Sequence, residues 1–462
     1  MSDADLDQLR DWDRAHVWHP FTALADWEAG EPLVIERGEG VYLYDAAGNR
    51  YLDGVSSLWC NVHGHRHPRL DAALVEQVGR LAHSTLLGVT HPTAIELARQ
   101  LVAVAPPGLT RVFYSDDGAT AVEVALKMAF QYWRQKDQPE PNRDRFVALG
   151  SAYHGDTLGD VSVGGVERFH AMFAPLLFPA LRIPSPHPYR CGLCRDGGCS
   201  RGCLDAAERV LAEHRGQVAA VIVEPLVQGA AGMVVHPPGY LAGLRDLCRE
   251  HDTLLIADEV AVGFGRTGTM FACEQEGVTP DFLCVAKGLT GGYLPLAATL
   301  TTEAIAAAFR GTAADAKTFM HGHTYAGNPL GCALGLANLA IFRDEATLER
   351  LQPKIDHLAR RLAEVAGMPQ VGNVRQRGFM AGIELVRDRA TGEPFPWSEQ
   401  VGARACRHAR TLGVLIRPLG DVIVVLPPLA IGVEQLDALL DAIVASIRAV
   451  VPAPSPQPEP TP

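Results

Sequence analysis

The sequence has no apolar run long enough to cross a bilayer. None of its 462 residues fall in a stretch of about 18 uncharged apolar residues, and residues 1–7 have neither a basic start nor an apolar signal core. Positive charge is also scarce, because 41 Lys and Arg against 53 Asp and Glu give a net charge of −12. A nucleic-acid-binding protein usually presents a basic face. We therefore expect no membrane span, no nucleic-acid partner and a cytoplasmic location.

Cysteine is too sparse for a disulfide scaffold, since a chain of 462 residues holds ten. Four of them cluster in a polar, glycine-rich insert, at Cys191, Cys194, Cys199 and Cys203. Four thiolates this close can hold zinc, and Cys191-x-x-Cys194 is a reasonable ligand pair. A second Cys-x-x-Cys is absent, so a surface loop with reduced cysteines remains the alternative. Any such zinc would be structural, and we expect no metal at the catalytic residues.

Strand and helix patterns alternate between residues 70 and 335. Apolar runs typical of buried strands are separated by stretches of helical periodicity. The expected strands are 112–115, 146–149, 219–224, 253–258 and 282–286. This alternation predicts an α/β fold with a mostly parallel sheet covered on both faces. In such sheets ligands bind at the carboxyl ends of the strands.

The pattern changes after about residue 345, where expected helices at 346–366, 398–412 and 433–450 alternate with short strands. This predicts a smaller α+β domain, joined by an N-terminal hairpin at 41–52. The last residues alternate with proline and can form neither helix nor ladder, so we expect a disordered tail. The expected division is 1–64 in the small domain, 65–340 as the large domain, 341–451 as the C-terminal small domain and 452–462 as the tail.

Lys287 lies between an apolar run and a glycine-rich turn, in Val-Ala-Lys-Gly-Leu-Thr-Gly-Gly at 285–292. A lysine in this place is positioned like a Schiff-base lysine, which needs a lowered pKa. Asp258 ends the preceding strand, where an acid can keep a pyridine nitrogen protonated. Taken alone, Lys287 could be an ordinary surface lysine. Taken alone, Asp258 could be a buried acid held by helix dipoles or by an arginine. Together, the two residues predict a pyridoxal phosphate enzyme.

Two further motifs fit this cofactor less specifically. The turn at 116–120, which contains Gly118, opens a helix whose free N–H groups suit a phosphate. Tyr153, at the start of Tyr-His-Gly-Asp-Thr, can stack on a flat ring. In isolation, an ordinary strand-to-helix turn and a core tyrosine are the alternatives.

These motifs and further blocks resemble the class III (ω-type) pyridoxal-phosphate-dependent aminotransferases. The resembling stretches are 16–22, 56–64, 114–132, 153–157, 224–229, 256–280, 286–302 and 319–332. The block Asp-Glu-Val-Ala-Val-Gly-Phe-Gly-Arg-Thr-Gly at 258–268, with the lysine that follows, is highly specific for this class. The resemblance runs from about residue 16 to 430. It implies fold type I of the pyridoxal phosphate enzymes, with a large domain and a smaller α+β domain.

Within the family, segments 56–64 and 321–324 resemble the branch that acts on 8-amino-7-oxononanoate in biotin biosynthesis. The implied reaction is a ping-pong transamination through pyridoxamine phosphate that yields 7,8-diaminononanoate. S-adenosylmethionine is the implied amino donor. Phe21, where the family commonly has tyrosine, and Leu58, where many members double the tryptophan, resemble members that can use lysine instead.

Two alternatives to this activity remain. One is another class III ω-aminotransferase that acts on a diamine or an ω-amino acid. The other is a non-catalytic protein of the same fold, which we would expect to have lost Lys287 or Asp258.

The resemblance also implies roles for individual residues. The expected catalytic residues are Lys287, Asp258 and Tyr153. The expected cofactor-binding residues are Gly118, Ala119, Tyr153, Asp258, Lys287, His323 and Thr324. The expected substrate-binding residues are Phe21, Trp59, Tyr153, Lys287, Gly322 and Arg417.

Several of these roles carry a structural consequence. His323 and Thr324 are expected to reach the cofactor phosphate of a neighbouring subunit, which implies a homodimer with a shared active site. Arg417 would offer a planar fork to the substrate carboxylate, with a surface salt bridge as its alternative. Ala119 stands where serine is frequent, and His323 where proline is frequent. Glu224 is a weaker candidate for a place near the cofactor.

Overall fold

The computed structural model describes residues 3–193 and 201–451. Its main sheet has seven strands in the order β4-β12-β11-β10-β7-β5-β6. These strands are β4 (Leu109–Ser115), β5 (Arg145–Leu149), β6 (Leu181–Ile183), β7 (Val218–Val223), β10 (Leu254–Asp258), β11 (Phe282–Val285) and β12 (Ala297–Thr302). All run parallel except β12, which is antiparallel to β4 and β11. The prediction of a mostly parallel sheet is therefore confirmed.

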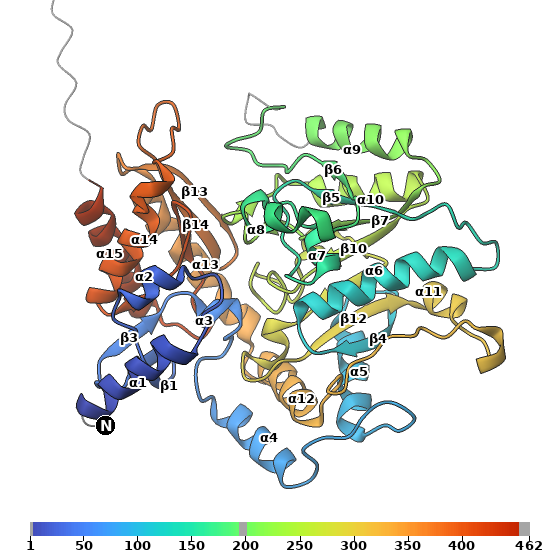
Figure 1. Ribbon diagram of the computed structural model, residues 1–462, viewed down its shortest axis with the longest axis horizontal. Helices are drawn as coiled ribbons and strands as arrows, with labels where there is room; N and C mark the ends of the chain where they lie inside the picture. Colours follow the sequence, from blue (N-terminus) through green and yellow to red (C-terminus); the bar gives the residue numbers. More distant parts are fainter. Residues whose placement is uncertain (1–2, 194–200, 452–462) are drawn as a thin grey trace, which may run out of the picture.

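Helices cover both faces of this sheet (Figure 1). In β10, Leu254 and Ile256 pack in a core with α6 (Gly118–Gln135), whereas Leu255 and Ala257 pack in the core that includes α10 (Tyr240–Glu250). Successive residues of a strand point to opposite faces, so each strand contributes to both cores. This explains why the strands read as continuous apolar runs.

The remaining helices of the N-terminal and central parts are short or of moderate length. They are α1 (Asp3–His16), α2 (Leu24–Glu28), α3 (Ser56–Trp59), α4 (Pro68–Val78), α5 (Pro92–Val104), α7 (Leu158–Val163), α8 (Glu167–His170), α9 (Arg201–Glu213), α11 (Glu303–Ala308) and α12 (Pro329–Asp344). Strands β8 (Val227–Gln228) and β9 (Val234–Val235) form a separate pair. Within residues 3–193 and 201–451, no helix is long and apolar enough to span a membrane.

A second, antiparallel sheet has the order β13-β14-β17-β16. Its strands are β13 (Val371–Arg377), β14 (Met380–Leu385), β16 (Pro418–Leu419) and β17 (Val422–Val425), and the helices of this part of the chain are α13 (Thr347–Ala366), α14 (Val401–Thr411) and α15 (Val433–Val450). The expected helix at 398–412 begins only at Val401, because Trp397–Glu399 form a 3-10 turn.

The N-terminal hairpin joins the C-terminal part of the chain, as expected. Strands β1 (Ile35–Glu39), β2 (Tyr42–Asp45) and β3 (Arg50–Asp53) form a sheet with β15 (Val414–Leu415), which pairs parallel to β3. Helix α12 runs through the expected domain boundary at 340, so the domain limits stay a prediction. The expected tail at 452–462 lies outside the described residues.

Candidate active site

A pocket of about 720 Å³ opens at the carboxyl ends of the parallel strands. Its lining includes six of the predicted site residues, namely Trp59, Gly118, Ala119, Tyr153, Asp258 and Lys287. All of these except Trp59 come from segments that are far apart in sequence and that meet because the strands before them end at one edge of the sheet. Trp59 comes from α3, which follows β3 of another sheet. A depression of about 950 Å³ on the outer surface of α6 contains none of the predicted residues.

Lys287 begins a short 3-10 turn after β11, with a positive φ of 43°. Its Nζ lies 5.4 Å from the centre of the Trp59 ring. Burial lowers the pKa of the Lys287 amine, although the nearby Asp258 carboxylate opposes this shift. A lowered pKa increases the fraction of neutral amine, which is the nucleophilic form.

Asp258 is held in place by His154, a contact that the sequence analysis missed. The Nδ1 of His154 lies 2.7 Å from Oδ2 of Asp258, and the Val260 amide donates to Oδ1 at 3.0 Å. The His154 side chain is fully buried. With Asp258 as a carboxylate, His154 donates from Nδ1 and fixes the orientation of the acid. His154 follows Tyr153 in the motif at 153–157, which was the available signal.

Tyr153 lies on the rim of the pocket and is fixed at both ends. Its hydroxyl donates to Oδ2 of Asp156 at 2.7 Å, and its backbone N–H donates to Oε2 of Glu224 at 3.2 Å. Phe169 contacts Tyr153 with ring centres 6.2 Å apart and contacts Phe21 at 5.4 Å. Phe21 itself is exposed. The structure therefore brings Phe21 near the pocket rim, with Phe169 between it and Tyr153.

Glu224 is a buried acid in the pocket wall. It accepts hydrogen bonds from the amides of Tyr153 and Gly229. Burial raises the pKa of Glu224 to about 8, and the negative charge of Asp258 adds to the shift. Glu224 therefore titrates in a range where an ordinary glutamate is already ionised.

We expect Glu224→Gln to change how the stability of the cofactor-free protein depends on pH. Between the ordinary glutamate pKa and about 8, folded Glu224 keeps a proton that the unfolded chain has released. The wild-type free energy of unfolding therefore gains from Glu224 at low pH and loses this contribution as pH rises through the folded pKa. Relative to wild type, the Glu224→Gln protein should become more stable from about pH 5 to about pH 9 in urea titrations. The exposed control Glu250→Gln should show no such trend, and a pH-independent difference for Glu224→Gln would contradict this prediction.

The first turn of α6 forms one end of the pocket. The side chains of Asp117 and Thr120 form a capping box at the start of the helix. The backbone N–H groups of Gly118 and Ala119 take no part in these capping hydrogen bonds. A Cβ on Gly118 would lie 2.5 Å from Cγ1 of Val260. The turn can therefore approach a ligand with its backbone N–H groups and with the positive end of the helix dipole.

These features fit a flat, phosphate-bearing aldehyde. The pocket offers a buried amine of lowered pKa, an oriented carboxylate, an aromatic ring and a helix start suited to phosphate. Each group is of the type that pyridoxal phosphate requires. The residues present are thus consistent with this cofactor.

We expect Gly118→Ala to weaken cofactor binding by roughly tenfold, since overpacking typically costs about 1–3 kcal/mol. The added methyl group would collide with Val260 and displace the turn. Titration of the cofactor-free protein with pyridoxal phosphate, followed by absorbance, measures the effect. Gly243→Ala is a matched control, because its Cβ would lie 2.5 Å from Cδ1 of Leu204, outside the pocket. The control should lower the melting temperature only, and equal affinities in all three proteins would disprove the role of Gly118.

Five predicted residues lie outside the lining of this pocket, and one of them is Phe21, which Phe169 separates from Tyr153. Gly322, His323 and Thr324 are exposed, and Nδ1 of His323 lies 2.9 Å from Oδ2 of Asp116, which lines the pocket. Arg417 is exposed between β15 and β16. The described chain therefore does not bring their side chains into the pocket lining, and their roles stay predictions.

The cysteine insert is described only in part. The Sγ atoms of Cys191 and Cys203 are 3.7 Å apart, whereas Cys194 and Cys199 lie outside the described residues. Among the residues that the structure describes, no group of three or more His, Cys, Asp or Glu is arranged to hold a metal. The zinc alternative thus stays untested.

Comparison with known proteins agrees with this site. The family model for aminotransferase class-III matches residues 24–447. The adenosylmethionine-8-amino-7-oxononanoate aminotransferase of Geobacter sulfurreducens is 55% identical over 97% of this chain and 99% of its own. The crystal structure of the Methanocaldococcus jannaschii protein of the same name superposes with a TM-score of 0.91, at 44% identity over 96% of this chain and 99% of that one. An omega transaminase from Pseudomonas jessenii, solved with PMP, gives 0.91 at 30% identity over 96% and 98%. The chain is therefore a member of the class III aminotransferases, which depend on pyridoxal phosphate.

Proposed function

We propose that this aminotransferase transfers an amino group to C7 of 8-amino-7-oxononanoate and so forms 7,8-diaminononanoate for biotin biosynthesis. The observation that carries the proposal is near full-length similarity to relatives named for this substrate, at 55% and 56% identity. The pocket contains the lysine and the acid that such a reaction requires.

When bound, pyridoxal phosphate supplies an aldehyde for the amine and a ring that draws electrons from the reacting carbon. Nζ of Lys287 would hold the cofactor and would serve as the base that takes the proton from the substrate carbon. Asp258, oriented by His154, would keep the ring nitrogen protonated. Tyr153, with its hydroxyl fixed by Asp156, would stack on the ring. The same groups serve both halves of a ping-pong cycle, because the second half reverses the first.

The remaining expected residues complete this proposal. Gly118 and Ala119 bind the phosphate, and Trp59 and Phe21 contact substrate. His323 and Thr324 serve the site of a second copy, so that a homodimer has two shared active sites, and Gly322 lies beside substrate there. Arg417 binds the substrate carboxylate with its guanidinium fork. We also propose a cytoplasmic location.

The amino donor is proposed to be S-adenosylmethionine, as in the names of the relatives. Lysine is the second candidate, because Phe21 lacks the tyrosine hydroxyl associated with donor recognition. The purified enzyme should be given 8-amino-7-oxononanoate with each donor separately, and the diamine detected by mass spectrometry. We expect diamine with at least one donor and none from the Lys287→Ala variant. Absence of diamine with both donors would contradict the proposal.

A broader ω-aminotransferase activity is the alternative function. It is favoured by the likeness to omega transaminases, which reaches a TM-score of 0.92 at 29% identity. Amino exchange between simple amines and ketones, without diamine from 8-amino-7-oxononanoate, would support it.

A further inference from the structure

The pocket wall that carries Trp59 has an unusual backbone. Ser56, Ser57 and Trp59 have φ angles of 52°, 60° and 67°, in the left-handed region that favours glycine. Each such residue costs about 1–2 kcal/mol. A segment with three of them keeps this conformation only if its surroundings hold it.

The conformation places the Trp59 ring between two parts of the site. The ring lies 5.4 Å from Nζ of Lys287, and a Cβ on Gly229 would lie 3.0 Å from Cζ3 of Trp59. Trp59 is 8% exposed and lines the pocket. A change in the backbone of this segment would therefore move the ring relative to the reacting amine.

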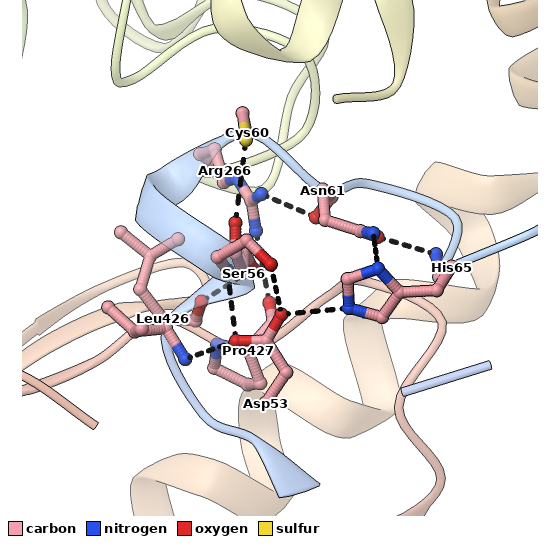
Figure 2. Close-up of polar contacts among 11 residues, drawn as sticks. Asp53, Ser56, Cys60, Asn61, His65, Arg266, Leu426 and Pro427 are labelled. Carbon is pink, nitrogen blue, oxygen red and sulfur yellow. Dashed lines mark hydrogen bonds and ion pairs between the residues drawn. The ribbon is translucent and has the colours of Figure 1, made fainter. Parts of the chain in front are cut away.

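The carboxylate of Asp53 holds the segment that carries Trp59 by hydrogen bonds. This carboxylate is fully buried and accepts hydrogen bonds from the Ser57 amide at 2.9 Å and the Ser57 hydroxyl at 2.9 Å. It also accepts from the Val55 amide at 3.3 Å and lies 3.0 Å from Nε2 of His65. Figure 2 shows Asp53 in contact with His65 beneath the segment.

His65 connects this buried charge to the other end of the segment. Its Nδ1 lies 3.1 Å from Nδ2 of Asn61, and Oδ1 of Asn61 accepts from the Gly64 amide at 2.8 Å. The partners assign the tautomer, since Nε2 donates to Asp53 and Nδ1 accepts from Asn61. Asp53, His65 and Asn61 thus form a continuous chain of hydrogen bonds (Figure 2), which links the two ends of the segment 53–65 that contains Trp59.

Three hydrogen bonds, made by Arg266 and Ser56, tie the segment 53–65 to distant parts of the protein. The guanidinium of Arg266, 1% exposed, donates to the carbonyls of Asn61 at 2.7 Å and Pro427 at 3.0 Å. The Ser56 hydroxyl donates to the Leu426 carbonyl at 2.6 Å. The segment that carries Trp59 is therefore fixed by hydrogen bonds with Asp53, Arg266 and Leu426 (Figure 2).

We propose that His65 and Asn61 are positioning residues that act through Asp53 to hold Trp59 beside Lys287 and so set the affinity for substrate. The ketone substrate in the test below rests on the proposed function. The positioning role itself requires only the aminotransferase site.

The first test needs neither cofactor nor substrate. Cys60 follows Trp59, is half-buried and lines the pocket. In the cofactor-free protein, we expect His65→Ala to raise the rate of Cys60 alkylation by iodoacetamide about tenfold, because the segment opens locally more often. Peptide mass spectrometry measures the rate at this thiol. The control His214→Ala, whose Nδ1 contacts Arg145 outside the pocket, should leave the rate unchanged. An unchanged rate in His65→Ala would overturn the proposal.

Two conservative variants keep the test decisive if His65→Ala fails to fold. Glutamine places its amide near the position of Nε2, whereas asparagine places it near Nδ1. We expect the Cys60 alkylation rate of His65→Gln to stay closer to that of wild type than the rate of His65→Asn does, because glutamine keeps a donor for the buried Asp53 carboxylate. If Cys60 is alkylated as slowly or more slowly in His65→Asn than in His65→Gln, the hydrogen bond from Nε2 of His65 to Asp53 is not the contact that matters.

A double-mutant cycle then separates positioning from general stability. We expect His65→Ala to raise KM for 8-amino-7-oxononanoate about tenfold, with a smaller change in kcat and in cofactor affinity, and to add little in a Trp59→Ala background. Additive effects of the two substitutions would show that His65 does not act through Trp59. If wild type fails to convert this ketone, only the proposed substrate fails, and the alkylation rates still decide the positioning role.

Discussion

Lys287→Ala is expected to abolish transamination, with a loss of kcat of at least about 10⁴-fold. The substitution removes both the amine that holds the cofactor and the group that moves the proton, and proton transfer alone contributes typically about 10²–10⁴-fold. The variant should also lose the absorbance band of the enzyme-bound cofactor. Stopped-flow half-reactions and absorbance spectra measure the two effects.

The control for this prediction is Lys136→Ala. Lys136 pairs with Glu140 at the far end of α6, at 2.7 Å, and does not line the pocket. It should retain wild-type activity and spectrum. An unchanged spectrum and appreciable turnover in Lys287→Ala, with a normal melting temperature, would remove the catalytic role of Lys287.

Asp258→Asn is expected to lower kcat by about 10²–10³-fold, in the range found when one preorganised electrostatic group is removed. Asparagine keeps the size of the side chain but cannot hold the ring nitrogen in its protonated form. It also weakens the contact with His154, because a charged hydrogen bond becomes a neutral one. Single-turnover rates of both half-reactions should fall together, since both need the same electron sink.

Asp246→Asn provides the matched control, because the side chain of Asp246 is 77% exposed. It should change neither rate. A variant at Asp258 that keeps wild-type single-turnover rates would mean that this carboxylate does not face the ring nitrogen.

The main strands of the large sheet could be predicted from the sequence, because their apolar runs are buried on both faces. The expected strand ends at Ser115, Leu149 and Asp258 agree with the structure. Strand β12 was missed. Its Ala-Ala-Thr-Leu-Thr-Thr sequence has no alternation, and its place between β4 and β11 depends on pairing with both of them.

The sequence predicts those site residues that lie in motifs next to strand ends. Lys287, Asp258, Tyr153 and Gly118 were found because each follows an apolar run that ends at the same edge of the sheet. His154 was not assigned a role, because its contact with Asp258 joins positions far apart in sequence. The hydrogen bonds that connect Asp53, His65 and Asn61 could not be predicted either, because they depend on how one irregular segment folds back on itself.

The most direct experiment on this active site is to find which amine holds the cofactor. The enzyme loaded with pyridoxal phosphate should be treated with sodium borohydride, which makes the link permanent, and digested for peptide mass spectrometry. We expect a single cofactor adduct, on the peptide that contains Lys287, and no such adduct in Lys287→Ala. An adduct on another lysine of the wild-type protein, such as Lys127 or Lys354, would contradict it.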